Sequence, residues 1–187
     1  TKGLDFDNVY LVGILDADML LNRPDFRAYE RSYQLMSQVA GRAGRQGKQG
    51  KVIVQTGDPD HWVLQLVGQH DYEQFYENEI IERKNYHYPP YYQLISFTLK
   101  HENIHTLDAS SEYLAELLKN VFKERIIGPE YPLVQKIRNK FLKTIKLKIE
   151  KNAPDLKVKQ KIKEIIDNFY TDANHKKVRV VIDVDPL

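Results

Sequence analysis

The sequence predicts an α/β protein with two regions, and three observations point to this class. Residues 9–56 contain an apolar run, a helical pattern and a second apolar run. Residues 94–185 contain alternating strand patterns separated by amphipathic helical patterns. The charge balance also changes sign, because residues 1–90 carry 10 Lys and Arg against 13 Asp and Glu, whereas residues 91–187 carry 18 against 13. We therefore expect two domains, one over residues 1–90 and one over residues 91–187.

The composition excludes several classes of protein. The chain has 187 residues, of which 42% are hydrophobic and 29% are charged, as is typical of a globular protein. No uninterrupted apolar run approaches the roughly 18 residues of a membrane-spanning helix, and no signal peptide opens the chain. There are no cysteines, which excludes disulfides and thiolate metal sites. We expect a cytoplasmic protein that has no membrane partner.

The first region is predicted to form a strand, a helix and a second strand. Residues 9–15 are almost continuously apolar, as a strand buried on both faces of a parallel sheet requires. Pro24 and Asp25 are start signals for a helix, and a second apolar run follows at residues 51–56. Two strands joined by a crossover helix form a βαβ unit of an α/β sheet. Because two strands cannot cover both faces of such a sheet, we expect the sequence to begin partway through a larger domain.

Two carboxylates follow the first predicted strand. Asp16 and Asp18 lie on the same side of the chain if both are extended, and paired carboxylates could bind Mg²⁺. The alternative, which we prefer, is that they cap the next element, because further oxygen ligands are not evident nearby.

A helix is predicted over residues 59–86, and Gly68 is a candidate position for an interruption. Trp62 and the tyrosines of this helix could stack on bases, but their helical spacing is explained by packing onto the sheet. The sequence Tyr88-Pro89-Pro90-Tyr91 ends the helix and marks the domain boundary.

The second region has the order strand, helix, strand, strand, helix, strand. The predicted strands cover residues 94–100, 126–129, 141–150 and 178–186, and helices begin at Thr106 and Pro154. This βαββαβ order is the ferredoxin-like arrangement. Many RNA-binding domains share it, but the aromatic cluster that they carry on the central strands is missing from this sequence.

The residues Gln38-Val39-Ala40-Gly41-Arg42-Ala43-Gly44-Arg45 form the most specific motif of the chain. Arg42 and Arg45 each follow a glycine at the end of a helical pattern, and their spacing puts both on one helix face. A guanidinium group stays charged and binds two phosphate oxygens at once. The alternative is ordinary helix termination, because cations favour the negative end of a helix and glycine caps it.

The composite Gln-x-x-Gly-Arg-x-Gly-Arg resembles motif VI of superfamily 2 helicases, and Lys2-Gly3-Leu4-Asp5-Phe6 resembles their motif V. The resemblance implies that residues 1–90 are the end of the second RecA-like helicase lobe. It also implies that Arg42 and Arg45 are catalytic and reach a triphosphate held by another lobe. The nucleotide-binding residues that it implies are Gly3, Asp5, Gln38, Gly41 and Gly44. Without the resemblance, Gly3 and Asp5 would be a turn glycine and a solvated acid.

Three further features narrow the resemblance to the primosomal replication-restart helicases. They are Pro89-Pro90, then Gly128-Pro129 followed by a basic strand, and the ending Val181-Ile182-Asp183-Val184-Asp185-Pro186. The resemblance covers essentially the whole chain. It implies a C-terminal part of a 3′→5′ DNA helicase that is driven by ATP with Mg²⁺ and restarts replication at stalled forks. The partners that it implies are forked and single-stranded DNA, single-strand binding protein and primosome proteins.

The sequence departs from these helicases in what it lacks. It contains no Gly-x-x-x-x-Gly-Lys-Ser/Thr phosphate loop and no Asp-Glu-x-His motif. The cysteine-rich zinc insertion of the family is also missing, so zinc is expected in the parent protein only. We therefore expect that ATP and Mg²⁺ are bound mainly by another lobe, and that these 187 residues alone hydrolyse no ATP.

The second region carries a basic surface. Residues 133–163 contain eleven Lys and Arg, opposed only by Glu150 and Asp155. Strand alternation puts Thr144, Lys146 and Lys148 on the face opposite Ile145 and Leu147. The residues expected to contact DNA phosphates are Lys136, Arg138, Lys140, Lys146 and Lys148. Two alternatives stay open, namely a solvated lysine face, and a binding module without catalysis whose partner is nucleic acid or the acidic tail of single-strand binding protein.

Overall fold

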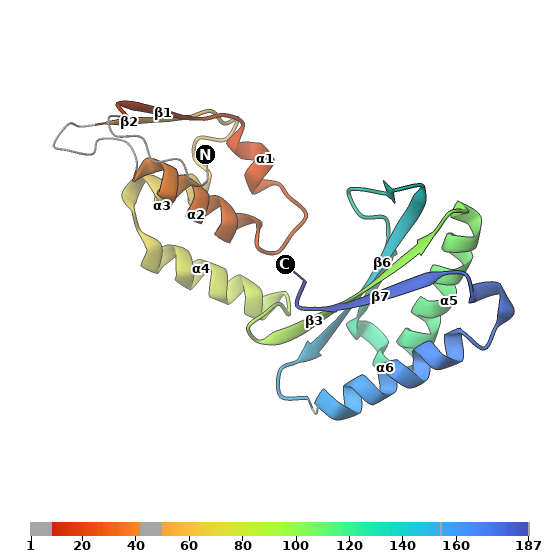
Figure 1. Ribbon diagram of the computed structural model, residues 1–187. Helices are drawn as coiled ribbons and strands as arrows, with labels where there is room; N and C mark the ends of the chain where they lie inside the picture. Colours follow the sequence, from red (N-terminus) through yellow and green to blue (C-terminus); the bar gives the residue numbers. More distant parts are fainter. Residues whose placement is uncertain (1–8, 42–49, 154, 187) are drawn as a thin grey trace. The chain divides into compact units, whose positions relative to one another are not determined.

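The computed structural model describes residues 9–41, 50–153 and 155–186. The chain divides into two units, Thr1–Arg83 and Lys84–Leu187 (Figure 1). Both units combine helices with β-strands, so the α/β class predicted from the sequence is confirmed. Residues 84–90 group with the second unit. Within the described ranges, no helix is both long enough and apolar enough to cross a membrane.

The first unit contains a parallel pair of strands. Strand β1 (Leu11–Ile14) pairs with β2 (Lys51–Val54) in the register that puts Leu11 opposite Lys51. Helices α1 (Ala17–Leu21) and α2 (Ala28–Ala40) lie between these strands in the chain. Parallel neighbours need such a crossover, because a tight turn can join only antiparallel strands. The short helix α1 was not predicted from the sequence.

Helix α2 begins later than Pro24 and Asp25 suggested. The Asp25 carboxylate accepts a hydrogen bond from the Arg27 backbone N–H at 3.0 Å. The Asp25 carbonyl accepts another from the Ala28 N–H at 2.9 Å. These two bonds close a turn ahead of the helix, so the start signals belong to the turn and not to the first helical residue.

The helix predicted over residues 59–86 is two helices, α3 (Trp62–Gln69) and α4 (Tyr72–Asn85). The break falls at His70, whose φ of 57° is left-handed, and not at Gly68. The Leu66 carbonyl accepts a hydrogen bond from the Asp71 N–H at 3.0 Å, which closes the end of α3. Residues 70 and 71 are neither glycine nor proline, so no breaker residue marks this break in the sequence.

The core of the first unit lies between α1, α2, α3 and the start of α4. Its buried residues are Ala17, Leu21, Tyr33, Met36, Val63, Leu66, Val67 and Phe75. The rings of Tyr33 and Phe75 are stacked with their centroids 4.3 Å apart, which ties α2 to α4. Trp62 stacks on Phe75 of α4 at 5.6 Å, so it packs against a helix, whereas packing onto the sheet was expected.

The second unit is built on an antiparallel sheet whose strand order is β4-β6-β3-β7. The strands are β3 (Tyr92–His101), β4 (Ile126–Glu130), β6 (Lys140–Glu150) and β7 (Arg179–Val184). The two-residue strand β5 (Lys136–Ile137) pairs with β6 and forms a hairpin with it. The long strands β3 and β6 thus occupy the centre of the sheet.

Two helices cover one face of this sheet, α5 (Ile104–Phe122) and α6 (Asp155–Phe169) (Figure 1). Helix α5 is capped by Asn103, whose side chain accepts from the Thr106 N–H at 3.0 Å, so it starts earlier than the predicted cap at Thr106. Short 3₁₀ turns, η2 (Lys123–Arg125) and η3 (Ala173–His175), lead into the outer strands.

The core of the second unit lies between the sheet and these helices. Its fully buried members include Phe97, Leu99, Leu107, Leu114, Leu118, Ile145, Leu147 and Phe169. The predicted alternation of Ile145, Leu147 and Ile149 toward the core is confirmed. Gly128 has a φ of 95°, and a Cβ there would lie 2.8 Å from the Thr144 carbonyl oxygen, so only glycine fits at this bulge.

Candidate nucleic-acid interface

The motif that contains the two arginines follows α2, and the structure describes its first part. Gln38 is exposed in the last turn of α2, and Gly41 forms the C-cap with its N–H donated to the Ser37 carbonyl. The predicted site residues Gly3, Asp5, Arg42, Gly44 and Arg45 lie outside the described residues. The roles of these seven residues therefore remain predictions.

Gly41 is not required by the local backbone. Its φ is −64°, an ordinary helical value, and an added Cβ would lie 3.5 Å from the nearest atom, the Ser37 carbonyl oxygen. That distance is normal van der Waals contact. A glycine at this position therefore leaves the surface beside the helix end uncovered, but the fold does not demand it.

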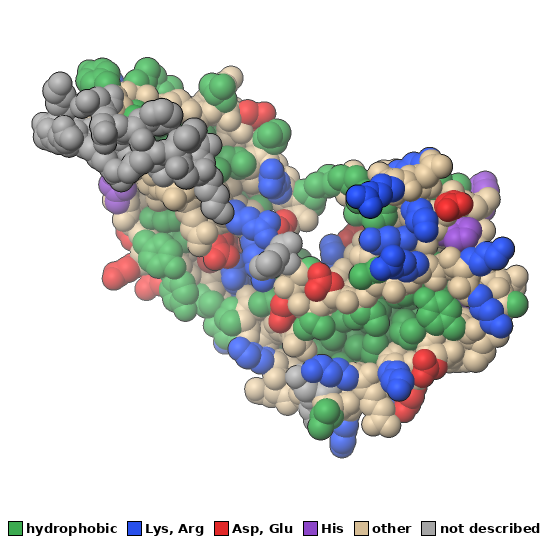
Figure 2. All heavy atoms as spheres, in the orientation of Figure 1, with side chains coloured by type: hydrophobic (Ala, Val, Ile, Leu, Met, Phe, Trp, Pro, Cys, Tyr) green, Lys and Arg blue, Asp and Glu red, His purple; other side chains and the backbone are tan. Residues whose placement is uncertain are grey.

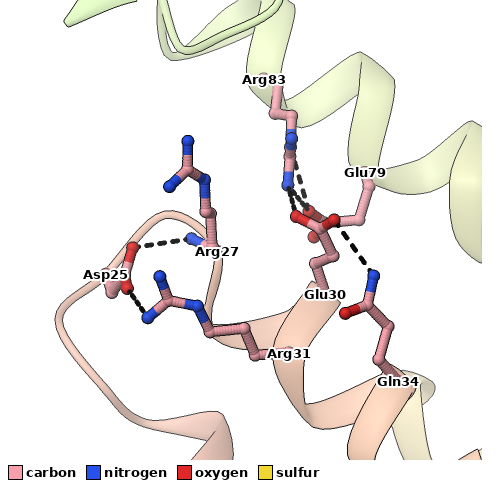
Figure 3. A network of polar contacts seen from close by, with 7 residues as sticks. All are labelled: Asp25, Arg27, Glu30, Arg31, Gln34, Glu79 and Arg83. Carbon is pink, nitrogen blue, oxygen red and sulfur yellow. Dashed lines mark hydrogen bonds and ion pairs between the residues drawn. The ribbon is translucent and has the colours of Figure 1, made fainter. Parts of the chain in front are cut away.

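A polar network holds α2 against α4 and so sets the position of the helix that leads to the motif (Figure 3). The guanidinium of Arg83 lies between two glutamates, with its Nη2 2.8 Å from Glu30 Oε2 and 3.3 Å from Glu79 Oε2. Gln34 donates to the other oxygen of Glu30 at 3.3 Å. Burial raises the pKa of Glu79 above its usual value, and the charge of Arg83 opposes that shift.

The two carboxylates after β1 have structural partners. Asp16 accepts a hydrogen bond from the Met19 N–H at 3.2 Å and caps α1. Asp18 accepts from the Thr56 hydroxyl at 2.6 Å and from the Gly57 N–H at 2.7 Å, so it joins α1 to the end of β2. These hydrogen bonds, the Thr56 one first, lower the pKa of Asp18. The capping interpretation fits Asp16, whereas Asp18 lies within α1 and links it to residues 56 and 57.

The face of the second sheet that points away from α5 and α6 is called the open face below. In antiparallel pairs, residues in register point to the same side, and successive residues alternate. The open face therefore carries Ser96 and Thr98 of β3 and their partners Lys146 and Thr144 of β6. Lys140 and Lys148 share this face by the same alternation. Each of the five predicted DNA contacts can now be placed.

Lys148 is not a free cation. Its Nζ donates to the Tyr86 carbonyl at 2.7 Å and lies 3.7 Å from the centroid of the Tyr88 ring. Burial lowers the pKa of Lys148, and the neighbouring charge of Lys146 lowers it further. The segment before β3 thus covers this lysine. Lys148 also lines a hollow of about 610 Å³ together with His87, Arg125 and Glu150.

Lys146 is also engaged. Its Nζ lies 2.6 Å from Glu130 Oε1 on the neighbouring strand β4. The side chain is 36% exposed, so this is a surface ion pair with a small contribution to stability. A phosphate could bind Lys146 only by competing with a carboxylate that already holds it.

The remaining three predicted residues belong to the β5–β6 hairpin. Arg138 and Asn139 form its turn and both have positive φ, 46° and 67°, as a type I′ turn requires. Lys140 is exposed and starts β6 on the open face. Lys136 is in register with Phe141 on the opposite face, and its Nζ lies 4.6 Å from the centroid of that ring.

Lys143 shows what the sequence pattern could not reveal about this strand. It breaks the run of outward lysines, since it points to the helix side and is 8% exposed. Its Nζ lies 2.9 Å from Asp108 Oδ1, and the Tyr131 hydroxyl donates to the same oxygen at 2.6 Å. This cluster ties α5 to β6 and to the segment that leads into the hairpin.

The comparisons with known proteins identify one family. The family described as "Primosomal protein N C-terminal domain" matches residues 84–187. The chain is 38% identical over 187 residues to "Replication restart protein PriA" of Bacillus subtilis, which covers 99% of the chain and 23% of that relative.

Relatives of the same name give similar values. The one from Treponema pallidum is 35% identical over 190 residues, which cover all of the chain and 28% of the relative. The one from Synechocystis is 34% identical over 190 residues, which cover all of the chain and 22% of the relative. The chain thus spans less than a third of the length of these curated relatives.

Proposed function

This chain belongs to the primosomal protein N C-terminal domain family, and from that premise we propose that it is the C-terminal part of an ATP-dependent 3′→5′ DNA helicase. The full-length protein would recognise stalled replication forks and restart replication by primosome assembly. The observation that carries the proposal is similarity to relatives named "Replication restart protein PriA" along both units of the chain. We place the protein in the cytoplasm, with forked and single-stranded DNA, single-strand binding protein and primosome proteins as partners.

The proposal assigns a fold to each unit. The first is the end of a RecA-like helicase lobe, which is supported by the parallel pairing of β1 with β2 around α2. The second is a ferredoxin-like domain, which is supported by the strand order β4-β6-β3-β7 and by two helices on one face. Fold alone does not give function, so the helicase role depends on the motif and on the family.

The proposed mechanism uses the two arginines of the motif as a sensor of the γ-phosphate. ATP hydrolysis spreads negative charge over the γ-phosphoryl oxygens, and an arginine that contacts them is worth about 10³–10⁵ in rate in related nucleotidases. ATP and Mg²⁺ are bound mainly by a second lobe, to which Arg42 and Arg45 reach when the lobes close. Gly3, Asp5, Gln38, Gly41 and Gly44 complete this wall of the cleft. Loss of the γ-phosphate removes the contact, the lobes reopen, and the bound strand advances.

An exchange of segments tests the proposal. This chain replaces the matching segment of the Bacillus subtilis relative, and ATP turnover of the chimera is measured with and without forked DNA. The chimera should keep turnover that forked DNA stimulates, whereas the 187-residue chain alone should show none. A folded chimera whose turnover does not respond to DNA would contradict the proposal, and so would DNA-stimulated turnover by the isolated chain.

The second unit is proposed to hold DNA through phosphate contacts. Arg138 and Lys140 are the predicted residues that best suit this role, because both are exposed and neither has an acidic partner within the described residues. Lys136 shares the hairpin on its other side. Lys146 and Lys148 contribute less, since a carboxylate holds the first and the Tyr86–Tyr88 segment covers the second. Such binding should weaken steeply with salt.

A further inference from the structure

We propose that Lys100 and Arg179 form a phosphate-binding pair at one end of the open face, where they extend the surface of Arg138 and Lys140. Together these four residues, here called the basic edge, hold the sugar–phosphate backbone of a single DNA strand. The inference rests on the DNA binding proposed above, and it adds two residues that the sequence patterns did not single out.

Strand register brings the pair together. Lys100 of β3 is directly opposite Arg179 of β7 and also opposite Leu142 of β6. Leu99 is fully buried toward the helices, so Lys100 points to the open face, and Arg179 must point there with it. Residues directly opposite each other have Cβ atoms about 4.5–5.5 Å apart. The two cationic side chains therefore leave the sheet side by side.

Like charges directly opposite each other destabilise a sheet, so this arrangement costs free energy unless an anion relieves it. Within the described residues, neither Lys100 nor Arg179 forms an ion pair with an acid. Glu102 follows in the turn after β3 without pairing with either of them. Asp183, on the same face of β7, lies four residues from Arg179, or about 13 Å along an extended strand.

Away from the basic edge, other cations of the same unit are paired with acids. There Lys146 pairs with Glu130, and Arg125 forms a bidentate pair with Glu150 at 2.7 Å. Asp185 accepts a hydrogen bond from the Leu94 N–H at 2.9 Å. Lys146 and Arg125 are thus compensated by acids, whereas Lys100, Arg138, Lys140 and Arg179 have no acidic partner among the described residues.

The basic edge crosses three neighbouring strands at one end of the sheet. The start of β6 with Lys140, the end of β3 with Lys100 and the start of β7 with Arg179 lie at the same end of the sheet, and neighbouring strands are about 4.8 Å apart. Lys176 and Lys177 are exposed directly before β7 and add charge there. Figure 2 shows Lys and Arg side chains gathered over this end of the second unit.

The neighbours of the pair decide the kind of contact. Thr98, Thr144 and Val181 are in register next to the pair, and none of them is aromatic. Among these described neighbours, bases have no ring to stack on, so binding should depend on phosphates and not on base sequence. An acidic peptide offers the same charge, and the experiment includes one as a separate arm.

The test measures binding of the 187-residue chain to a labelled single strand of about 20 nucleotides of mixed sequence, over a range of salt concentrations. The double variant Lys100→Gln Arg179→Gln is compared with the control Arg125→Gln Lys161→Gln, which removes one arginine and one lysine that are ion-paired to Glu150 and Glu164. We expect the first variant to lose about tenfold in affinity and to flatten the log–log salt slope by about 1.4. The control should change affinity by less than about twofold.

Thermal unfolding separates lost binding from lost structure. Removal of the like-charge repulsion should leave the unfolding temperature of the first variant equal to or above that of the wild type. If the wild type binds DNA and the first variant binds it as well as the control does, the DNA-binding role of the basic edge is contradicted. The proposal that this chain binds DNA is then unaffected. If the wild type binds a polyglutamate peptide through the pair but binds no DNA, both the inference and the proposed DNA contact fail.

Discussion

Lys148 and Tyr88 form a cation–π contact in which the ammonium group lies 3.7 Å from the ring centroid. The same ammonium donates to the Tyr86 carbonyl, so one lysine of β6 anchors the segment that enters β3. Burial lowers the pKa of Lys148, because a partly desolvated place disfavours the charged form. A residue that strand alternation assigned to an exposed basic face is therefore part of the structure of the second unit.

Lys148→Met should lower the free energy of unfolding of the second unit by about 1–2 kcal/mol, because the hydrogen bond and the ring contact are both lost. DNA affinity should change little. Lys146→Met is the matched control, since it breaks only a surface ion pair and should cost less than about 1 kcal/mol. Denaturant unfolding of the two variants measures the difference. Equal losses of stability, or a large loss of DNA affinity in the first variant alone, would contradict this role.

Asp108 should make the stability of the second unit depend on acid pH. The hydrogen bond from Tyr131 is the main cause that lowers the pKa of Asp108, and Lys143 lowers it further. Because the folded state holds the ionised form, this stabilisation is present above the usual carboxyl pKa near 4 and is lost as the pH falls through the depressed value. The stability gap between wild type and Asp108→Asn should thus be largest at neutral pH and shrink in acid.

Unfolding by denaturant at a series of pH values measures that gap. Tyr131→Phe removes the hydrogen bond but keeps the ring, and it should reduce the same pH-dependent part. A gap that stays constant from neutral pH into acid would rule out Asp108 as the source.

Arg138 should lower the stability of the second unit and strengthen its binding to DNA. Its φ of 46° puts a side chain with a Cβ into the left-handed region, which is costly for residues other than glycine and asparagine. Arg138→Gly should raise the free energy of unfolding by about 0.5–1 kcal/mol, after the entropy of glycine in the unfolded chain is subtracted. The same variant should bind DNA more weakly, because a cation leaves the basic edge.

Asn139→Gly is the control for this turn. Asn139 also has a positive φ, but asparagine tolerates that region, so the gain in stability should be at most a few tenths of a kcal/mol. No charge is lost, so binding should be unchanged. The interpretation fails if Arg138→Gly destabilises the chain, or if both variants bind DNA equally well.

Arg83 and Glu79 should show strong coupling in the first unit. The Glu79 side chain is 8% exposed, so Arg83→Met leaves a buried carboxylate with no cation and should cost about 3 kcal/mol. The double variant Arg83→Met Glu79→Gln should recover most of this loss. Burial raises the pKa of Glu79, so the loss in the single variant should grow as the pH rises through that value. A double-mutant cycle at two pH values measures the coupling, and simple additivity would exclude it.

The sequence was sufficient for the class of fold and for the family, and it failed where contacts depend on distant segments. Alternation in β6 predicted which residues face the core, because that pattern is local. It could not predict that the Tyr86–Tyr88 segment covers Lys148, since that segment lies some sixty residues earlier. The break at His70 was missed because neither His70 nor Asp71 is a glycine or a proline, the residues that usually mark such a break.

The candidate site was predictable to a lesser degree. Gln38 and Gly41 lie at the end of α2 as the helical pattern indicated, and Arg42 and Arg45 lie outside the described residues. Lys100 and Arg179 are unremarkable in the sequence, where 78 residues separate them. Only the register of β3 with β7 brings them together. A search for unopposed cations on strand ends could have found each residue, but not the pair.

The central claim, that this chain supplies an arginine wall to an ATP site, is tested most directly by ATP turnover of the Bacillus subtilis chimera with substitutions in the motif. Arg42→Ala and Arg45→Ala should each lower DNA-stimulated turnover by at least about two orders of magnitude, and Arg→Lys should rescue little, because a point charge cannot replace the planar fork. Arg31→Ala, which breaks only the surface pair with Asp25, should leave turnover near the starting value. Near-normal turnover in the Arg→Lys variants, or in either alanine variant, would contradict the claim.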